Sequence, residues 1–353
     1  MFYLKYRPKT LKEIDNSKVK ETLVKLLNAK EIPHALLFIG QKGTGKTSAA
    51  RIFAKAVNCL DNKFADIKSL GYEPCNQCAN CSSISNSSFT DVLELDAASN
   101  RGIEEVKSLI RETAFLPMAG RFRVFIIDEV HMITPDGFNA LLKTLEEPPK
   151  SAIFILATTN QEKLPKTIIS RCLKVNFGKA GKNDLISMLN RILKNEQIQL
   201  SAEIVDLIAL HSDESFRDAA KILEEFIVQK IVTIDEAEKY LGLRGKNNLL
   251  PLIEEADIKK VLVWVDEFAI SGGSFKNLLQ DVLEKLRLAL LSKKGYKQEN
   301  DTPCKLSVSE ITMLIKLLME AYQNLKYSPI ESLPLEIALV EFYNQSNKSL
   351  KEN

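Results

Sequence analysis

The feature that most limits how this chain can fold is a glycine-rich segment at residues 40–47. Its sequence, GQKGTGKT, fits the phosphate-binding pattern G-x-x-x-x-G-K-T. It follows an apolar run at Ala35–Ile39 and precedes a helical pattern, which is the context that such a loop requires. Glycines let the backbone N–H groups face phosphate oxygens, and the following helix dipole favours negative charge. An ordinary glycine turn before a helix is the competing interpretation, and the complete pattern in this position favours a phosphate site.

Two side chains of this segment have the chemistry that a nucleoside triphosphate requires. In such loops the lysine, here Lys46, reaches the β- and γ-phosphates, and the hydroxyl that follows it, here Thr47, holds Mg²⁺. The predicted nucleotide-binding residues of the segment are Gly40, Gln41, Lys42, Gly43, Thr44, Gly45, Lys46, Thr47 and Ser48.

A second apolar run, Val124–Ile127, ends in the two carboxylates of Asp128 and Glu129. The carboxyl end of a parallel strand is where open α/β sheets bind ligands. Asp128 is suited to hold the magnesium ion, and Glu129 is suited to polarise an attacking water. A solvated acidic turn is the simpler interpretation of the pair alone, but its combination with the phosphate-binding segment favours a catalytic site.

Five short apolar runs alternate with helical patterns in residues 1–178. Most of the runs are continuous, as in strands that are buried on both faces of a parallel sheet. Apolar residues at helical spacing in Val19–Leu27 and Phe138–Leu145 predict helices that pack on this sheet. We therefore predict a doubly wound α/β domain at residues 1–178. The expected strands are Ala35–Ile39, Val92–Asp96, Val124–Ile127, Ile153–Ala157 and Leu173–Phe177.

The β signal fades beyond Gly178. We predict a small helical domain at residues 179–241, a linker at 243–248 and a second helical domain within 242–353. The segments with the form of a helix-capping box are Ser215–Asp218, Thr233–Glu236 and Ser307–Glu310.

Four of the six cysteines are crowded into one segment with the spacing C-x15-C-x2-C-x2-C. Four thiolates at this spacing predict a closed tetrahedral zinc site of structural role, since no histidine lies nearby to suggest a zinc-bound water. An iron–sulfur cluster is the weaker alternative, and four free thiols are another. The predicted zinc ligands are Cys59, Cys75, Cys78 and Cys81. Cys172 and Cys304 are single and are expected to be buried core thiols.

Composition limits the classes of protein that need consideration. The 48 Lys+Arg balance 46 Asp+Glu to a net charge of +2, so any nucleic-acid contact must come from a local basic patch. The apolar runs are too short to span a membrane, and the first ten residues lack the apolar core of a secretory signal. We therefore expect a cytoplasmic protein. The histidines at 34, 131 and 211 have no carboxylate or serine pattern around them, so a hydrolase triad is not supported.

Taken together, these residues resemble an AAA+ ATPase, and more narrowly the gamma/tau family of bacterial DNA polymerase III clamp-loader subunits. The resemblance covers nearly the whole chain and is densest in residues 1–225. The segments that carry it are Tyr6–Pro8, Gly40–Thr47, the four cysteines, Asp96–Asn100, Gly120–Arg121, Ile127–Met132, Phe138–Pro149, Ala157–Thr159, Leu164–Pro165, Ser170–Cys172 and Ser215–Ala219.

The resemblance implies residue roles that the residues alone do not give, since Arg171 and Arg217 read by themselves as ordinary surface charges. It implies that Thr159 senses the γ-phosphate and that Arg171 acts in trans on ATP bound by a neighbouring subunit. It implies that Arg217 reaches from a helical lid to its own ATP. It also implies that the adenine pocket is lined by Tyr6, Arg7 and Pro8.

The family resemblance further implies an architecture and a set of partners. Residues 179–241 would be the lid, and residues 242–353 a helical collar that holds a five-subunit ring. The implied partners are delta-type and delta-prime-type subunits, a sliding clamp, primer–template DNA and the polymerase III holoenzyme, with no polymerase site in this chain itself. Residues near Asn100 and Arg101 would track DNA phosphates.

Two features depart from the family pattern. Glu214 stands where relatives often have glycine, which questions the turn before Arg217. The chain ends at residue 353, so we expect a gamma-like form without the additional domains of tau. The alternatives are another AAA+ DNA-processing ATPase of the Holliday-junction or helicase-loader type, against which the cysteine insert argues, and a non-hydrolysing scaffold subunit, against which the intact Lys46 and Glu129 argue.

Overall fold

The computed structural model describes residues 1–64, 71–99, 102–241, 249–255, 257–270, 272–295 and 304–351. The chain forms two compact units, Met1–Lys230 and Ile231–Asn353. The predicted boundary between an α/β domain and a lid at residue 178 falls inside the first unit and stays a prediction. The expected linker at 243–248, together with Asn100 and Arg101, lies outside the described residues.

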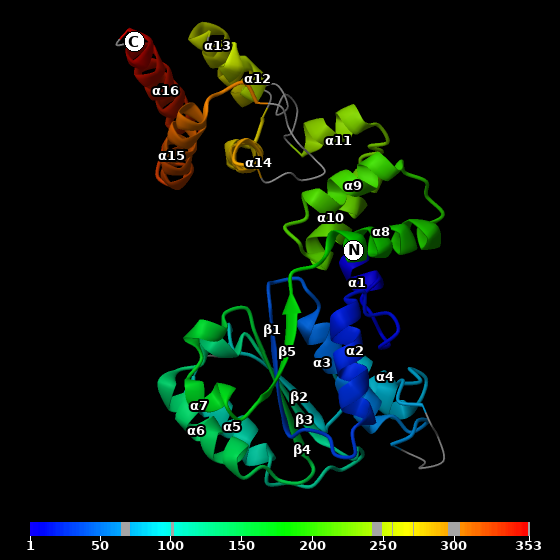
Figure 1. Cartoon of the computed structure of the whole chain (residues 1–353). Coiled ribbons are helices and arrows are strands. Elements are labelled where there is room, and N and C mark those ends of the chain that lie inside the picture. Colours follow the sequence, from blue (N-terminus) through cyan, green and yellow to red (C-terminus); the bar gives the residue numbers. More distant parts are fainter. Residues whose placement is uncertain are drawn as a thin grey trace. The chain divides into compact units, whose positions relative to one another are not determined.

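A parallel sheet of five strands forms the centre of the first unit, in the order β2-β3-β4-β1-β5 (Figure 1). Every predicted run lies within one of these strands, so the α/β prediction with its five parallel strands is confirmed. The strands are β1 (Ala35–Gly40), β2 (Val92–Asp96), β3 (Arg123–Asp128), β4 (Ala152–Thr158) and β5 (Leu173–Gly178).

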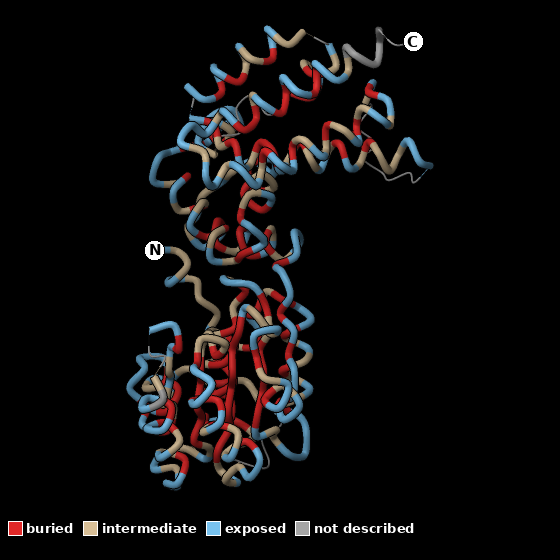
Figure 2. Tube along the Cα trace, turned by 90° about the vertical axis from the view of Figure 1, so that its left-hand side faces the viewer, coloured by how far each residue is buried: buried red, intermediate tan, exposed pale blue. Residues whose placement is uncertain are grey.

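Helices cover both faces of the sheet because successive side chains of a strand point to opposite sides. Leu36 and Phe38 of β1 enter one core with α2 (Ser17–Asn28) and α3 (Lys46–Asn58). Leu37 enters the opposite core. The helices of that second core are α5 (Ile103–Glu112), α6 (Pro135–Glu146) and α7 (Lys166–Ile169). Figure 2 shows the resulting band of buried residues along the strands.

Burial differs between the central strands and the edges of the sheet. All seven residues of β4 are buried, whereas β2 has no buried residue and β5 alternates between exposed and buried positions in its second half. The continuous apolar runs therefore correspond to full burial in β1, β3 and β4, whereas the edge strands β2 and β5 are only partly buried.

A buried carboxylate fixes the turn that leads into β3. Asp91 is fully buried, and its side chain accepts hydrogen bonds from the N–H groups of Met118, Ala119 and Gly120 at 2.7–3.0 Å. Burial raises the pKa of Asp91, but these N–H donors outweigh it, so the pKa lies below its ordinary value of 3.8.

Three further helices and the chain start complete the first unit. The helices are α8 (Lys182–Glu196), α9 (Ala202–Leu210) and α10 (Phe216–Val228). The short N-terminal helix α1 (Phe2–Lys5) joins them, since the backbone N–H of Phe2 donates to Glu224 of α10 at 2.9 Å. Ser215 caps α10 by accepting from Asp218 N at 3.2 Å. The aspartate side chain is one methylene shorter than the Glu of a full capping box, and no reciprocal bond from it is found in the described region.

Among its described residues, the second unit has helices as its only regular secondary structure, as expected. Its helices are α11 (Ile234–Tyr240), α12 (Leu249–Glu254), α13 (Ile258–Ile270), α14 (Phe275–Lys293), α15 (Val308–Asn324) and α16 (Leu333–Lys351). Those from α12 to α16 share one apolar core. The capping boxes predicted at Thr233–Glu236 and Ser307–Glu310 are both present. None of the helices in the described part of the chain combines the length and apolar character needed to cross a bilayer.

Candidate active site and cysteine cluster

A cavity of about 540 Å³ lies at the carboxyl ends of β1 and β3 in the first unit. Its walls come from the N-terminal segment, the glycine-rich loop, the acidic end of β3 and the helices α8 and α10. This volume is within the usual range for small-molecule sites. The predicted site residues that line the cavity are Tyr6, Arg7, Pro8, Lys42, Gly43, Thr44, Gly45, Lys46, Thr47, Ser48, Asp128, Glu129 and Arg217.

The glycine-rich loop folds as the sequence pattern requires. Gly43 and Gly45 have φ angles of +80° and +94°, which side chains other than glycine rarely adopt. At these two glycines the chain turns from β1 into α3, so the free N–H groups at the N-terminus of α3 lie beside the cavity. The loop therefore presents the positive end of a helix dipole where an anion would bind.

Lys46 places a buried cation in this loop. Its side chain is only 5% exposed, and its Nζ donates to the carbonyl oxygens of Gly40 and Gln41, both at 2.8 Å. Burial lowers the pKa of Lys46, against the carboxylates of Glu129 and Asp128, which raise it. A buried ammonium group at the start of a helix is suited to bind phosphate.

Thr47 and Asp128, far apart in the sequence, meet at the base of the cavity. The Thr47 hydroxyl donates to Asp128 Oδ2 at 2.6 Å, and Asp128 Oδ1 accepts from the backbone N–H of Glu129 at 2.9 Å. A hydroxyl beside a carboxylate is a pair of hard oxygen donors of the kind that Mg²⁺ prefers. These two residues therefore fit the magnesium role predicted for them.

Glu129 stands in a strained backbone conformation at the end of β3. Its φ of +47° is unusual for a residue other than glycine and costs of order 1–3 kcal/mol. Its Oε2 accepts from both the hydroxyl and the backbone N–H of Thr159, at 3.0 and 3.3 Å. Thr159 is therefore brought to the predicted catalytic carboxylate, although it does not line the cavity itself.

The N-terminal segment lies between the loop helix and the last helices of the unit. Arg7 Nε donates to Ser48 Oγ at 2.7 Å, and burial lowers the pKa of Arg7. The Tyr6 hydroxyl donates to Glu196 at the end of α8 at 2.6 Å. Tyr6, Arg7 and Pro8 thus form a wall of the cavity, as expected for an adenine pocket.

The start of α10 packs directly on the glycine-rich loop. A Cβ built on Gly43 would overlap the Ser215 hydroxyl and lie 3.3 Å from Arg217 Cβ. Arg217 lines the cavity. Glu214 adopts φ +55°, so the turn before Arg217 keeps a left-handed backbone although glycine is absent there.

Arg171 lies away from the cavity of its own chain. It follows α7, and its Nη2 contacts Glu146 Oε1 at 2.5 Å. Its side chain is 34% exposed, and it is not among the residues that line the cavity. Its predicted role on the ATP of a neighbouring subunit stays a prediction.

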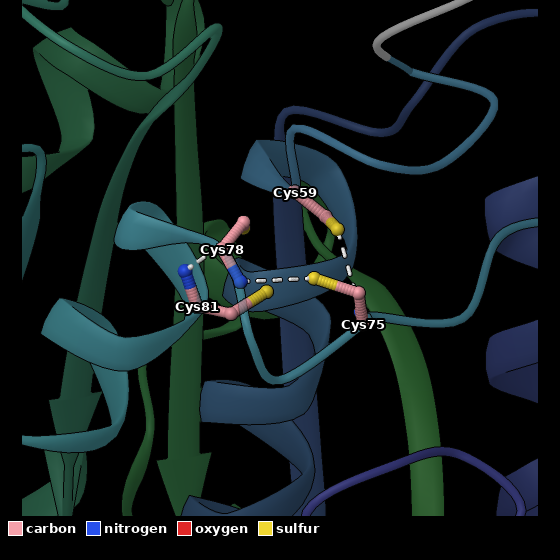
Figure 3. A group of neighbouring side chains, drawn as sticks. All are labelled: Cys59, Cys75, Cys78 and Cys81. Atoms are coloured by element: carbon pink, nitrogen blue, oxygen red, sulfur yellow. Dashed lines mark hydrogen bonds between the residues drawn. The ribbon is translucent and has the colours of Figure 1, made fainter.

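The four cysteines converge, as Figure 3 shows. Their Sγ atoms all lie within 4.8 Å of one another, close to the edge of about 3.8 Å that a tetrahedral site with Zn–S bonds of about 2.3 Å requires. They come from the end of α3 (Cys59), the following loop (Cys75) and α4 (Ala79–Ser85) with its cap (Cys78 and Cys81).

Backbone N–H groups point at the sulfur atoms. Cys75 Sγ accepts from Cys78 N at 3.2 Å, and Cys59 Sγ accepts from Cys75 N at 3.4 Å. Although burial raises it, the pKa of Cys78 is lowered to about 7 by the N–H groups of Leu60 and Cys81. Burial raises the pKa of Cys75 and Cys81, so it is the convergence of the four sulfur atoms that fits a zinc ion.

The structure also brings together residues that the sequence pattern did not identify. His131 Nδ1 lies 3.4 Å from Glu129 Oε2, so the expectation that no carboxylate accompanies this histidine is wrong. Its position two residues after Glu129 was a possible signal, since the 3-10 turn η1 (Val130–Met132) bends the chain back on itself. For Glu196 the sequence holds no comparable signal, because its partner Tyr6 is 190 positions away.

The sequence of the chain is similar to a family profile and to several known proteins. The family profile described as "DNA polymerase III, delta subunit" matches residues 15–181. The chain is 35% identical to DNA polymerase III subunit tau of Bacillus subtilis, over 98% of this chain and 64% of that protein. It is 30% identical to DNA polymerase III subunit gamma of Buchnera aphidicola subsp. Baizongia pistaciae, over 98% of this chain and 97% of the relative.

Among solved structures, the chain is similar to the Thermotoga maritima RuvB Holliday junction branch migration motor. The TM-score is 0.48 and the sequence identity 18%, over 76% of this chain and 86% of that one.

Proposed function

Since the chain belongs to the gamma/tau family of bacterial DNA polymerase III subunits, we propose that it is the ATP-hydrolysing motor of a replicative clamp loader in the cytoplasm. In this proposal ATP binding assembles an open ring of subunits that grips a sliding clamp and primer–template DNA. Hydrolysis of ATP then releases the clamp.

The observation that carries the proposal is the convergence of five side chains on one cavity. Lys46 and Thr47 come from the loop helix, Asp128 and Glu129 from the end of β3, and Arg217 from α10. These are a phosphate-binding cation, a pair of oxygen donors for a metal, a base and a second cation. The set is what phosphoryl transfer to water requires.

The roles follow from position and charge. Lys46 and the N–H groups at the start of α3 bind the β- and γ-phosphates, and Arg217 approaches from α10. Glu129 orients the attacking water and accepts its proton. Mg²⁺, held by Thr47 and Asp128, would neutralise charge on the transferred phosphoryl group. Tyr6, Arg7 and Pro8 would enclose the adenine base.

Arg171 completes the proposed site from a neighbouring subunit. A guanidinium group supplied in trans stabilises the charge that develops in the transition state. In the free chain Arg171 is held by Glu146, a contact between two part-exposed groups that a stronger anion displaces at little energetic cost. Hydrolysis would therefore depend on assembly of the ring.

Two exposed apolar faces of the second unit support its proposed role as the collar. On α16, Leu333, Ile337 and Val340 lie together with Glu336 and Glu341. On α13, Val263 and Trp264 lie with Lys259, Lys260 and Glu267. The first face carries two acids, and the second carries two lysines and one acid, so the faces are opposite in net charge, which favours head-to-tail contacts between subunits in a ring.

The remaining partner assignments rest on family membership. We propose that delta-type and delta-prime-type subunits complete a five-subunit ring within the polymerase III holoenzyme. The contacts with DNA would be made mainly to its phosphates, and the affinity for DNA would therefore fall as the salt concentration rises. The four cysteines would hold a structural zinc ion that orders the segment between α3 and α4.

The experiment measures ATP binding and ATP turnover separately, in the assembly with clamp and primed DNA. Lys46→Ala should abolish nucleotide binding, and Glu129→Gln should keep binding but lose turnover. Normal turnover in either variant would contradict the assignment of the site.

A matched pair of variants tests the trans role of Arg171. Arg171→Ala should bind ATP but fail to hydrolyse it in a ring made wholly of the variant. Glu146→Gln breaks the same ion pair but keeps the arginine, and it should hydrolyse ATP normally. Hydrolysis at the wild-type rate by Arg171→Ala would remove this residue from the reaction.

A further inference from the structure

His131 lies in the first unit directly beside the proposed catalytic carboxylate. It belongs to the 3-10 turn η1, and its side chain is only 10% exposed. Its Nδ1 atom is 3.0 Å from Thr158 Oγ1 and 3.4 Å from Glu129 Oε2. One ring nitrogen therefore faces both the end of β4 and the end of β3.

The hydrogen bonds of Thr158 indicate whether this nitrogen donates or accepts a hydrogen bond. The single proton of the Thr158 hydroxyl is donated to the carbonyl oxygen of Asn160 at 3.1 Å. The same hydroxyl oxygen accepts the backbone N–H of Asn160 at 3.0 Å. With the Thr158 proton on Asn160, the tautomer that fits these contacts carries its hydrogen at Nδ1 and donates it to Thr158 Oγ1. A lone pair at Nδ1 would also face the negative Glu129 oxygen.

Both hydrogen bonds that the Glu129 carboxylate accepts from the described residues fall on one of its two oxygens. Oε2 accepts from Thr159 Oγ1 and Thr159 N, with the His131 nitrogen next to them. Oε1 has no hydrogen-bond donor from the described residues. A carboxylate with one oxygen held by donors and the other oxygen open can receive a proton from water, as a general base must.

We propose that His131 is a positioning residue for ATP hydrolysis: its Nδ1–H, hydrogen-bonded to Thr158 Oγ1, lies 3.4 Å from Oε2 of Glu129 and attracts that oxygen electrostatically, so that Oε1 faces the attacking water. This inference rests on the proposed function, since it assumes that Glu129 is the base. His131 itself is not among the residues that line the cavity. It acts through Glu129, and without it the carboxylate is held by Thr159 alone.

Two substitutions separate the two nitrogens of the ring. His131→Asn places an amide N–H at the position of Nδ1, whereas His131→Gln places its amide nitrogen at the position of Nε2. His131→Gln should lower kcat for ATP by roughly 10-fold or more, a part of the roughly 100-fold to 10 000-fold that general-base catalysis supplies. His131→Asn should keep kcat within about 3-fold of wild type, and both variants should bind ATP as wild type does.

The protonation of the ring is tested independently of activity. NMR of histidine-labelled protein, with His131 assigned by its loss in the variant, should show the neutral ring protonated at Nδ1. An Nε2-protonated ring would overturn the proposal. So would a wild-type kcat in His131→Gln, or an equal loss in both variants that melt like wild type. If the wild-type assembly binds no ATP, the proposed function fails, and the NMR result alone decides the contact between His131 and Glu129.

Discussion

The contact between the glycine-rich loop and α10 gives a quantitative prediction for Gly43→Ala. Gly43 has φ +80°, and a methyl group there would overlap the Ser215 hydroxyl and lie 3.0 Å from Ser215 Cβ. Gly45 has φ +94°, but a methyl group built on it meets no atom within 4 Å. The two glycines share the backbone strain and differ only in the contact with α10.

The expected loss of stability has two parts, the backbone strain and the contact with Ser215. A left-handed backbone costs an alanine about 1–2 kcal/mol, which is the whole effect expected for Gly45→Ala. Overpacking against Ser215 adds about 1–3 kcal/mol for Gly43→Ala. For a unit of this size each kcal/mol lowers Tm by about 2–4 °C. Gly43→Ala should therefore melt well below Gly45→Ala in the absence of nucleotide.

The assay is thermal and denaturant unfolding of the full chain, together with the double variant Gly43→Ala/Ser215→Gly. Ser215→Gly removes the obstructing side chain, while glycine at the start of a helix costs only a few tenths of a kcal/mol. The double variant should recover most of the difference between the two glycine variants. Equal destabilisation of both single variants, or no recovery, would refute the packing of α10 on the loop.

Three further predictions concern parts of the chain outside the cavity. Cys78→Ser should remove bound zinc and lower Tm by about 5 °C or more, whereas Cys304→Ser should leave zinc content unchanged; zinc retained in Cys78→Ser would contradict the metal site. Asp91→Asn should destabilise the chain by about 2–3 kcal/mol at neutral pH. Because the pKa of Asp91 lies below 3.8, its contribution is complete above that pH and is lost as pH falls further, so the variant should lose less stability on acidification. A stability curve parallel to wild type would argue against this. Glu214 already pays the left-handed backbone cost of about 1–2 kcal/mol at φ +55°, so Glu214→Gly, which relieves it, should be more stable than Glu214→Val by about that amount; equal stability of the two in denaturant would refute the left-handed turn.

Local patterns in the sequence sufficed for several parts of this protein. The five strands, the turn at Gly40–Thr47 and the capping boxes at Thr233 and Ser307 depend on residues within a few positions of one another. The spacing of the cysteines likewise placed three of them within one turn and short helix. Periodicity and glycine content decide such features before any long-range contact forms.

The partners of the site residues were decided only by the tertiary structure. Thr47 meets Asp128 across 81 positions, Tyr6 meets Glu196 across 190, and Glu129 meets Thr159 across 30. The proton on His131 depends in turn on Thr158 and Asn160, on a different strand end. Hydrogen bonds need both atoms placed to within a few tenths of an ångström, and only the packing of strands and helices fixes positions that well for residues so distant in the chain.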